Sequence, residues 1–120
     1  MRFDGLLMAA ALAVVAAPAH AEPRWLACKY TDQRGAARNF HMVFDDMRNT
    51  VAFWDGIALV EGTSTGITFQ AIRTRFPQFF LTYNRNDGAL SMTPLESRYG
   101  GLLHGECQRS PPPPGAPPDL

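Results

Sequence analysis

The chain has 120 residues, a formal net charge of zero and two cysteines. This length accommodates a single folded domain. Zero net charge argues against nucleic acid or an anionic membrane surface as the partner, because both demand clustered positive charge. The same neutrality does not distinguish a protein partner from a sugar.

The start of the chain has the three-part pattern of a secretory signal peptide. A short polar segment with one basic residue is followed by an unbroken apolar run over residues 6–17. Pro18 ends the run, and residues 19–21 (Ala-His-Ala) place small side chains at the positions that precede a cleavage site. The run is shorter than the roughly 20 apolar residues that cross a bilayer, which disfavours a transmembrane anchor. We therefore expect residues 1–21 to be removed before Glu22, leaving a mature protein in the periplasm or secreted.

Two cysteines, Cys28 and Cys107, lie near the ends of the expected mature domain. An even number of cysteines in an oxidising compartment predicts a disulfide bond. A lipoprotein box before Cys28 is disfavoured, because Trp25 and charged residues separate this cysteine from the apolar run. A redox role would favour C-x-x-C spacing, which the sequence lacks. We expect a structural bridge.

Alternation of apolar and polar residues dominates the mature chain, and no segment shows a helical period. The strongest hairpin signal is the Asn86-Asp87-Gly88 turn between two β-rich runs. Residues 62–66 are expected to form a loop. The expected strands cover residues 26–31, 39–45, 50–54, 57–61, 67–73, 79–84, 89–92 and 102–107.

These short, evenly spaced strands predict an all-β fold over residues 22–109, an antiparallel meander of seven or eight strands closed as a small barrel or curled sandwich. Cys28 is in phase with apolar Leu26, and Cys107 with Leu103, so both sulfurs can face the interior. The bridge would then hold the first and last strands together. This favours closure, which removes the unpaired edges of an open sheet.

The composition changes at residues 110–120. Six of the last ten residues are proline. A segment of this kind is typical of extended polyproline II, and we expect a disordered tail that does not pack onto the core. A spacer or a docking peptide is the alternative role for such a tail.

No pattern of residues indicates an enzyme, a cofactor or a metal site. His41 and His104 have no Cys or His at metal-ligand spacing, and no serine lies in a G-x-S-x-G motif. Asp45, Asp46 and Asp55 could bind calcium, but they lie at expected strand ends, where aspartate favours turns, and EF-hand spacing is absent. We expect turn chemistry there.

The candidate binding residues are arginines and aromatic side chains near expected loops. Such residues are enriched at protein-binding hot spots. The same pattern also fits solvated strand arginines and, at Trp54, a core side chain. The candidates are Trp25, Arg73, Arg75, Arg85, Arg98 and Tyr99.

The Trp25-x-x-Cys28 opening, the hairpin over residues 83–90 and the closing Gly105-Glu106-Cys107 resemble small, uncharacterised periplasmic proteins of proteobacteria. The chain is also similar in architecture to periplasmic inhibitors of C-type lysozyme, which are small barrels with a signal peptide and cysteines. Those inhibitors carry a Ser-Gly-x-x-Tyr loop motif that enters the enzyme's cleft. Residues 97–100 (Ser-Arg-Tyr-Gly) have the same residue types in a different order.

The sequence therefore predicts a periplasmic, non-enzymatic binding or inhibitor-like module that acts through loops on a rigid barrel. Its partner would be a periplasmic or extracellular protein. One alternative is a carrier of a small apolar ligand, although side chains are expected to fill a barrel of this size. The other is an envelope-structural protein that uses the proline-rich tail.

Overall fold

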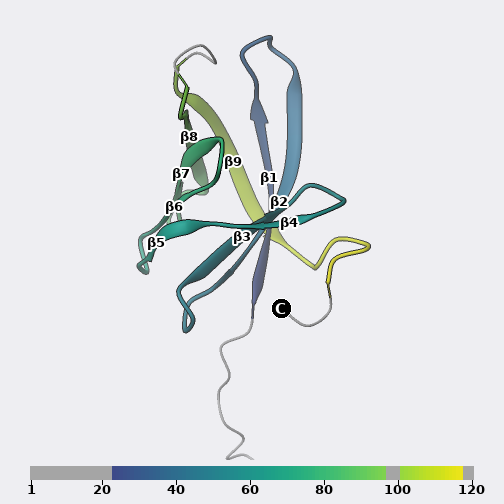
Figure 1. Cartoon of the computed structure of the whole chain (residues 1–120), viewed down its shortest axis with the longest axis vertical. Coiled ribbons are helices and arrows are strands. Elements are labelled where there is room, and N and C mark those ends of the chain that lie inside the picture. The colour runs from purple at the N-terminus through teal and green to yellow at the C-terminus, as the bar shows by residue number, and fades with distance from the viewer. Residues whose placement is uncertain (1–22, 97–100, 118–120) are drawn as a thin grey trace, which may run out of the picture.

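The computed structural model describes residues 23–96 and 101–117 (Figure 1). Their secondary structure is nine antiparallel strands in one nearly closed barrel sheet. The expected all-β barrel is thus confirmed, with nine strands rather than seven or eight. The strands are β1 (Arg24–Thr31), β2 (Ala37–Asp45), β3 (Thr50–Trp54), β4 (Leu59–Glu61), β5 (Thr63–Ile67), β6 (Ala71–Arg75), β7 (Phe79–Asn84), β8 (Ala89–Pro94) and β9 (Leu103–Ser110).

The expected signal peptide, residues 1–21, lies outside the described residues. Among the residues that the structure does describe, no helix is long and apolar enough to cross a membrane.

The sheet has the order β4-β3-β2-β1-β9-β8-β7-β6-β5, so one pair, β1 with β9, joins strands from the two ends of the chain. Cys28 and Cys107 lie directly opposite each other in this pair and form a disulfide bond. Both cysteines are buried in the core. The expected bridge and its interior position are confirmed.

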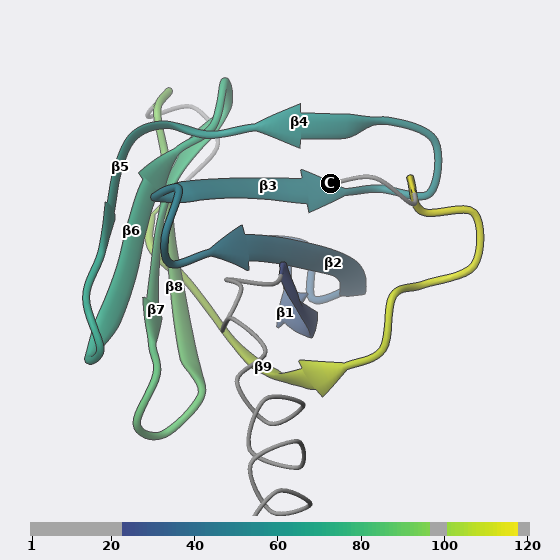
Figure 2. The same cartoon turned by 90° about the horizontal axis from the view of Figure 1, so that it is seen from below.

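The strands β4 and β5 lie at the two ends of the strand order and follow each other through Gly62. Figure 2 shows the sheet curling so that β5 comes back toward β3. The Asn49 side chain spans the remaining gap: its amide nitrogen donates to the Thr65 carbonyl at 2.8 Å, and its oxygen accepts from the Ile67 N–H at 3.1 Å. The Asn49 amide thereby makes two hydrogen bonds that backbone groups of a neighbouring strand would otherwise make. These bonds satisfy a carbonyl and an N–H of β5, at the edge of the sheet.

The interior is filled mainly by side chains from β1, β2, β3 and β6 to β9, together with Phe76 from the turn between β6 and β7. Six of the large ones are fully buried, namely Phe76, Met42, Ile72, Leu81, Leu90 and Val51. One end of the barrel carries a series of aromatic rings, each in contact with the next: Tyr30, Phe40, Phe53, Phe76 and Phe79. We call this the aromatic end.

Residues 62–73 differ from the sequence expectation. The expected loop over residues 62–66 contains β5, and the expected strand over residues 67–73 is divided by a turn before β6. Thr68 makes this turn, because its hydroxyl accepts the Ala71 N–H at 3.0 Å. The composition of β5, rich in Thr, Ser and Gly, resembles that of a loop. Its pairing with β6 is irregular between Thr63 and Gly66, which weakens the alternation further.

The proline-rich tail also differs from expectation where it is described, at residues 111–117. It leaves β9, turns, and returns toward β3 and β4 (Figure 2). Ala116 packs against a cluster of buried side chains that includes Trp54. The expectation of a tail that stays off the domain does not hold for this segment, because two tryptophans on the outer face of the sheet give it apolar surface to cover.

Reduction of the Cys28–Cys107 bond should lower the free energy of unfolding by up to about 4.5 kcal/mol, because the bond joins residues 79 positions apart and restricts the unfolded chain. Urea unfolding of the oxidised and reduced protein measures this difference. The double variant Cys28→Ala/Cys107→Ala is the control and should not respond to reductant. A loss below about 1 kcal/mol in the native protein would contradict a structural role for the bond.

Candidate functional site

The end of the barrel opposite the aromatic end carries three arginines. Arg24, Arg85 and Arg109 each lie two residues beyond a core side chain of β1, β7 or β9. Alternate residues of a strand share a face, so each arginine continues an interior row of apolar side chains out to the rim. We call this the arginine end.

Arg85 is the most firmly held of the three. Its guanidinium donates to both carboxylate oxygens of Asp46, at 2.9 and 3.3 Å, and to the Thr68 carbonyl at 2.7 Å. It also lies over the Phe44 ring, 5.0 Å from the centroid. The side chain is only 16% exposed. Arg85 therefore ties the turns after β2 and β5 to the end of the core.

Arg24 and Arg109 are more available to a ligand. Arg24 approaches the Asp46 carboxylate at 3.7 Å and is 55% exposed. Arg109 is exposed, and its guanidinium has no hydrogen bond or ion pair with the described residues. A guanidinium has five N–H donors, so both side chains keep donors for an incoming anion.

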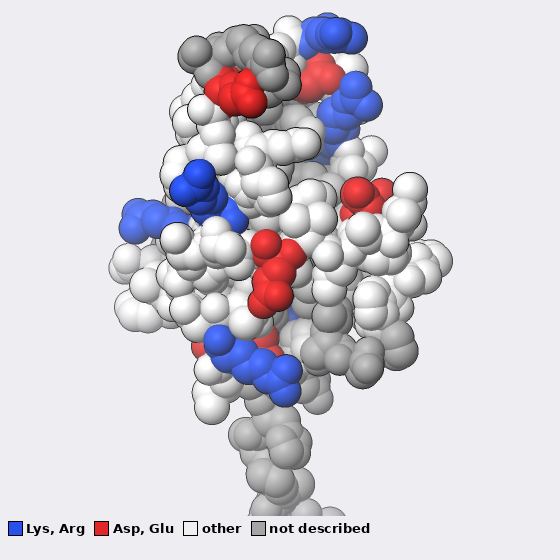
Figure 3. All heavy atoms as spheres, viewed as in Figure 1, with Lys and Arg blue, Asp and Glu red and all other residues white. Residues whose placement is uncertain are grey.

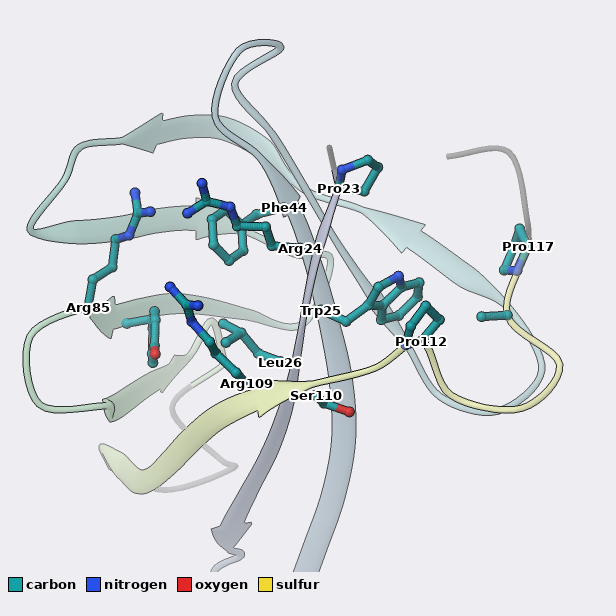
Figure 4. A pocket seen from close by; sticks show the side chains of 12 residues that line it. Pro23, Arg24, Trp25, Leu26, Phe44, Arg85, Arg109, Ser110, Pro112 and Pro117 are labelled. Atoms are coloured by element: carbon teal, nitrogen blue, oxygen red, sulfur yellow. The ribbon is translucent and has the colours of Figure 1, made fainter. Parts of the chain in front are cut away.

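The arginine end opens into a hollow of about 840 Å³, and Figure 4 shows the three guanidinium groups projecting into the same space. This volume falls in the range of small-molecule sites, roughly 300–1,000 Å³. The remaining wall of the hollow is mainly apolar: Pro23, Trp25, Leu26, Phe44, Tyr83, Pro112, Ala116 and Pro117.

Tyr83 places its phenol among these groups. Burial raises the pKa of the Tyr83 hydroxyl above its ordinary value of 10.0, while the positive charges of Arg85 and Arg109 act in the opposite direction. The hydroxyl therefore stays protonated at neutral pH and can donate a hydrogen bond.

The structure brings together two of the residues expected to bind, Trp25 and Arg85, which both line the hollow. Arg73 and Arg75 lie on the exposed face of β6, and Arg75 lies over the Phe80 ring, 5.5 Å from the centroid. The last two, Arg98 and Tyr99, lie outside the described residues, as do the other positions of the 97–100 motif.

Sequence reasoning missed Arg24, Arg109, Phe44 and Tyr83. The signal for Arg24 was its phase with Leu26 and Cys28 in the first strand. Arg109 was missed because the last strand was expected to end at Cys107, whereas β9 continues to Ser110 and places Arg109 opposite Leu26.

The aspartates named above either accept hydrogen bonds within turns or pair with arginines. Asp45 accepts the Met47 and Arg48 N–H groups at 3.0 and 3.2 Å. Asp55 accepts two backbone N–H groups in the turn before β4, and these bonds lower its pKa. Asp46 instead pairs with arginines. Over residues 23–96 and 101–117, no group of three or more His, Cys, Asp or Glu side chains is placed to hold a metal ion.

Comparison of the chain with models of protein families, with curated proteins and with solved structures finds no match.

Replacing Arg85 by alanine should destabilise the protein by about 2 kcal/mol, because hydrogen bonds to a partly buried charge are lost. The matched change Arg24→Ala removes an exposed ion pair to the same carboxylate and should cost less than about 0.5 kcal/mol. Urea unfolding at neutral pH compares the two. Equal losses would show that Arg85 does not hold the arginine end together.

Proposed function

We propose that this chain is a non-enzymatic binding protein of the periplasm or the exterior, and that its ligand site is the hollow at the arginine end. The observation that carries the proposal is the pair of exposed guanidiniums, Arg24 and Arg109, on the rim of a hollow walled by aromatic and proline side chains. These features suit a ligand with an anionic group and an apolar body.

Each part of such a ligand has a partner in the hollow. A carboxylate, sulfonate or phosphate accepts paired N–H groups from a guanidinium, which matches its geometry better than an ammonium does. Pro23, Pro112 and Pro117, which are less buried than Trp25 and Phe44, offer apolar surface to the body of the ligand, and the Tyr83 hydroxyl adds a donor. The arginines attract an anionic ligand only at short range. The chain is neutral overall, and its charged side chains are scattered over the face seen in Figure 3.

The lining favours binding over catalysis. Its polar groups are arginines, one phenol and the Ser110 hydroxyl, which itself donates to the Pro111 carbonyl at 2.7 Å. The carboxylate that contacts Arg24 and Arg85, Asp46, is already paired with both of them. A general base with free capacity is thus missing from the described lining.

A carrier with its ligand inside the barrel receives less support. Met42 and Ile72 have no exposed surface, and Phe76, fully buried, packs against Phe53 and Phe79 at the aromatic end. The ligand we propose therefore lies at the rim of the core and does not replace it.

The disulfide bond supports export. Bridges of this kind form and persist in oxidising compartments, which agrees with the signal-peptide pattern of residues 1–21. The buried bridge also uses the sulfur of Cys28, which leaves no thiol there for a lipid anchor.

The proposed site predicts that anilinonaphthalene sulfonate, an anion with an aromatic body, binds the folded protein with a dissociation constant below about 1 mM. Arg24→Ala/Arg109→Ala should weaken this binding at least about tenfold, because charge-assisted hydrogen bonds are lost. Fluorescence titration measures both values.

The control is Arg73→Ala/Arg75→Ala, which removes the same number of arginines from the exposed face of β6. This variant should bind as the native protein does. Equal weakening in both double variants would mean that the dye responds to the total positive charge of the protein. The hollow would then not be the ligand site.

A further inference from the structure

The outer face of β1, β2 and β3 carries a second cluster of buried apolar side chains, separate from the barrel core. Its members are Trp25, Val43, Ala52 and Trp54, with Leu59 and Ala116 packed against them. Trp25 lies opposite Val43, and Val43 opposite Ala52, so these three form one row across the strands. Both tryptophans of the chain thus lie on this face. We call it the tryptophan face.

The proline-rich tail reaches the tryptophan face by a defined route. β9 ends at Ser110, directly opposite Trp25. The tail then turns over residues 113–116, where the Ala116 N–H donates to the Pro113 carbonyl at 3.1 Å. Gly115 has a φ of 85°, which a type II turn with proline before it requires. This turn directs Ala116 onto the cluster.

The exposure of the tail residues agrees with the contact between Ala116 and the tryptophan face. Pro113, Ala116 and Pro117 are half-buried, whereas Pro111 is exposed. Pro112 and Trp25 line the same hollow, and Figure 4 shows Pro112 beside the Trp25 indole. The segment therefore presents apolar side chains to the two indoles and keeps its other residues in water.

We propose that the tryptophan face is a binding surface for proline-rich segments, and that residues 111–117 are the segment that occupies it in this chain. Grooves lined by aromatic side chains recognise proline-rich peptides because proline stiffens the peptide before binding and little entropy is lost. Tethering raises the effective concentration of the tail to the millimolar range, so it occupies the surface ahead of weak competitors.

The partner that fits this surface is a proline-rich segment of another protein, which must displace the tail. Displacement would also change the hollow at the arginine end, since Pro112, Ala116 and Pro117 form part of its wall. The two sites share Trp25, Ala116 and other tail residues, but their tests are separate: tryptophan emission reports on the tail, and Arg24→Ala/Arg109→Ala reports on the ligand in the hollow.

Tryptophan fluorescence reports on this face directly, because both tryptophans lie in it. In the full mature chain, Ala116→Asp should shift the emission to longer wavelength, since a charged side chain disrupts the contact and admits water to the indoles. The matched control is Pro111→Asp, which puts the same charge on an exposed residue of the same tail and should leave the emission unchanged. Pro117→Ser is a milder second variant and should shift the emission in the same direction as Ala116→Asp.

Recognition is tested by adding a synthetic peptide of residues 111–120 to the Ala116→Asp protein. The peptide should restore the native emission in a saturable way, and a peptide with all six prolines replaced by serine should not. Unchanged emission in both Ala116→Asp and Pro117→Ser would overturn the tail's position on the indoles. No effect of the proline peptide up to millimolar concentration, or equal effects of the two peptides, would overturn recognition of proline.

Discussion

The pairing of β1 with β9 across the Cys28–Cys107 bond is the constraint on which the rest of the structure depends. All other neighbouring strands are close in sequence, whereas this pair joins the two ends of the domain. Its register places Arg109 opposite Leu26 and Ser110 opposite Trp25. The pairing of Arg109 with Leu26 brings Arg109 to the end of the barrel where Arg24 lies. The pairing of Ser110 with Trp25 places the start of the tail beside the tryptophan face. Both proposed surfaces thus follow from one register.

The two ends of the barrel differ because interior rows end in different residues. At one end the rows of β1, β2 and β3 finish in Tyr30, Phe40 and Phe53, whose partly buried rings contact one another. At the other end the rows of β1, β7 and β9 finish in arginines, which cannot be buried without partners and so remain at the rim. Only one of these arginines, Arg85, finds enough partners to be held close to the core. The remaining charges shape a hollow open to solvent.

The β class, the bridge and most strands were predictable, since alternation and the Asp87-Gly88 turn depend on local sequence. The strand β5 was not, because its side chains are mainly Thr, Ser and Gly and do not form an apolar row. Its contacts with β6 include one between the Thr65 and Thr74 hydroxyls at 2.9 Å. The site was predictable only in part. Trp25 and Arg85 were expected, but the grouping of Arg24 with Arg109 requires the β1–β9 register, which strand patterns alone do not supply. The path of the tail likewise depends on tertiary contacts with Trp54.

We propose that the chain is exported as a domain closed by one disulfide bond, and the intact mass of the protein recovered from the organism that makes it tests this proposal most directly. The measurement is made under non-reducing conditions, with and without a thiol-alkylating reagent. We predict the mass of residues 22–120 less two hydrogens, unchanged by alkylation. Two alkylated cysteines, or a chain that starts at Cys28 and carries the added mass of a lipid, would contradict the account.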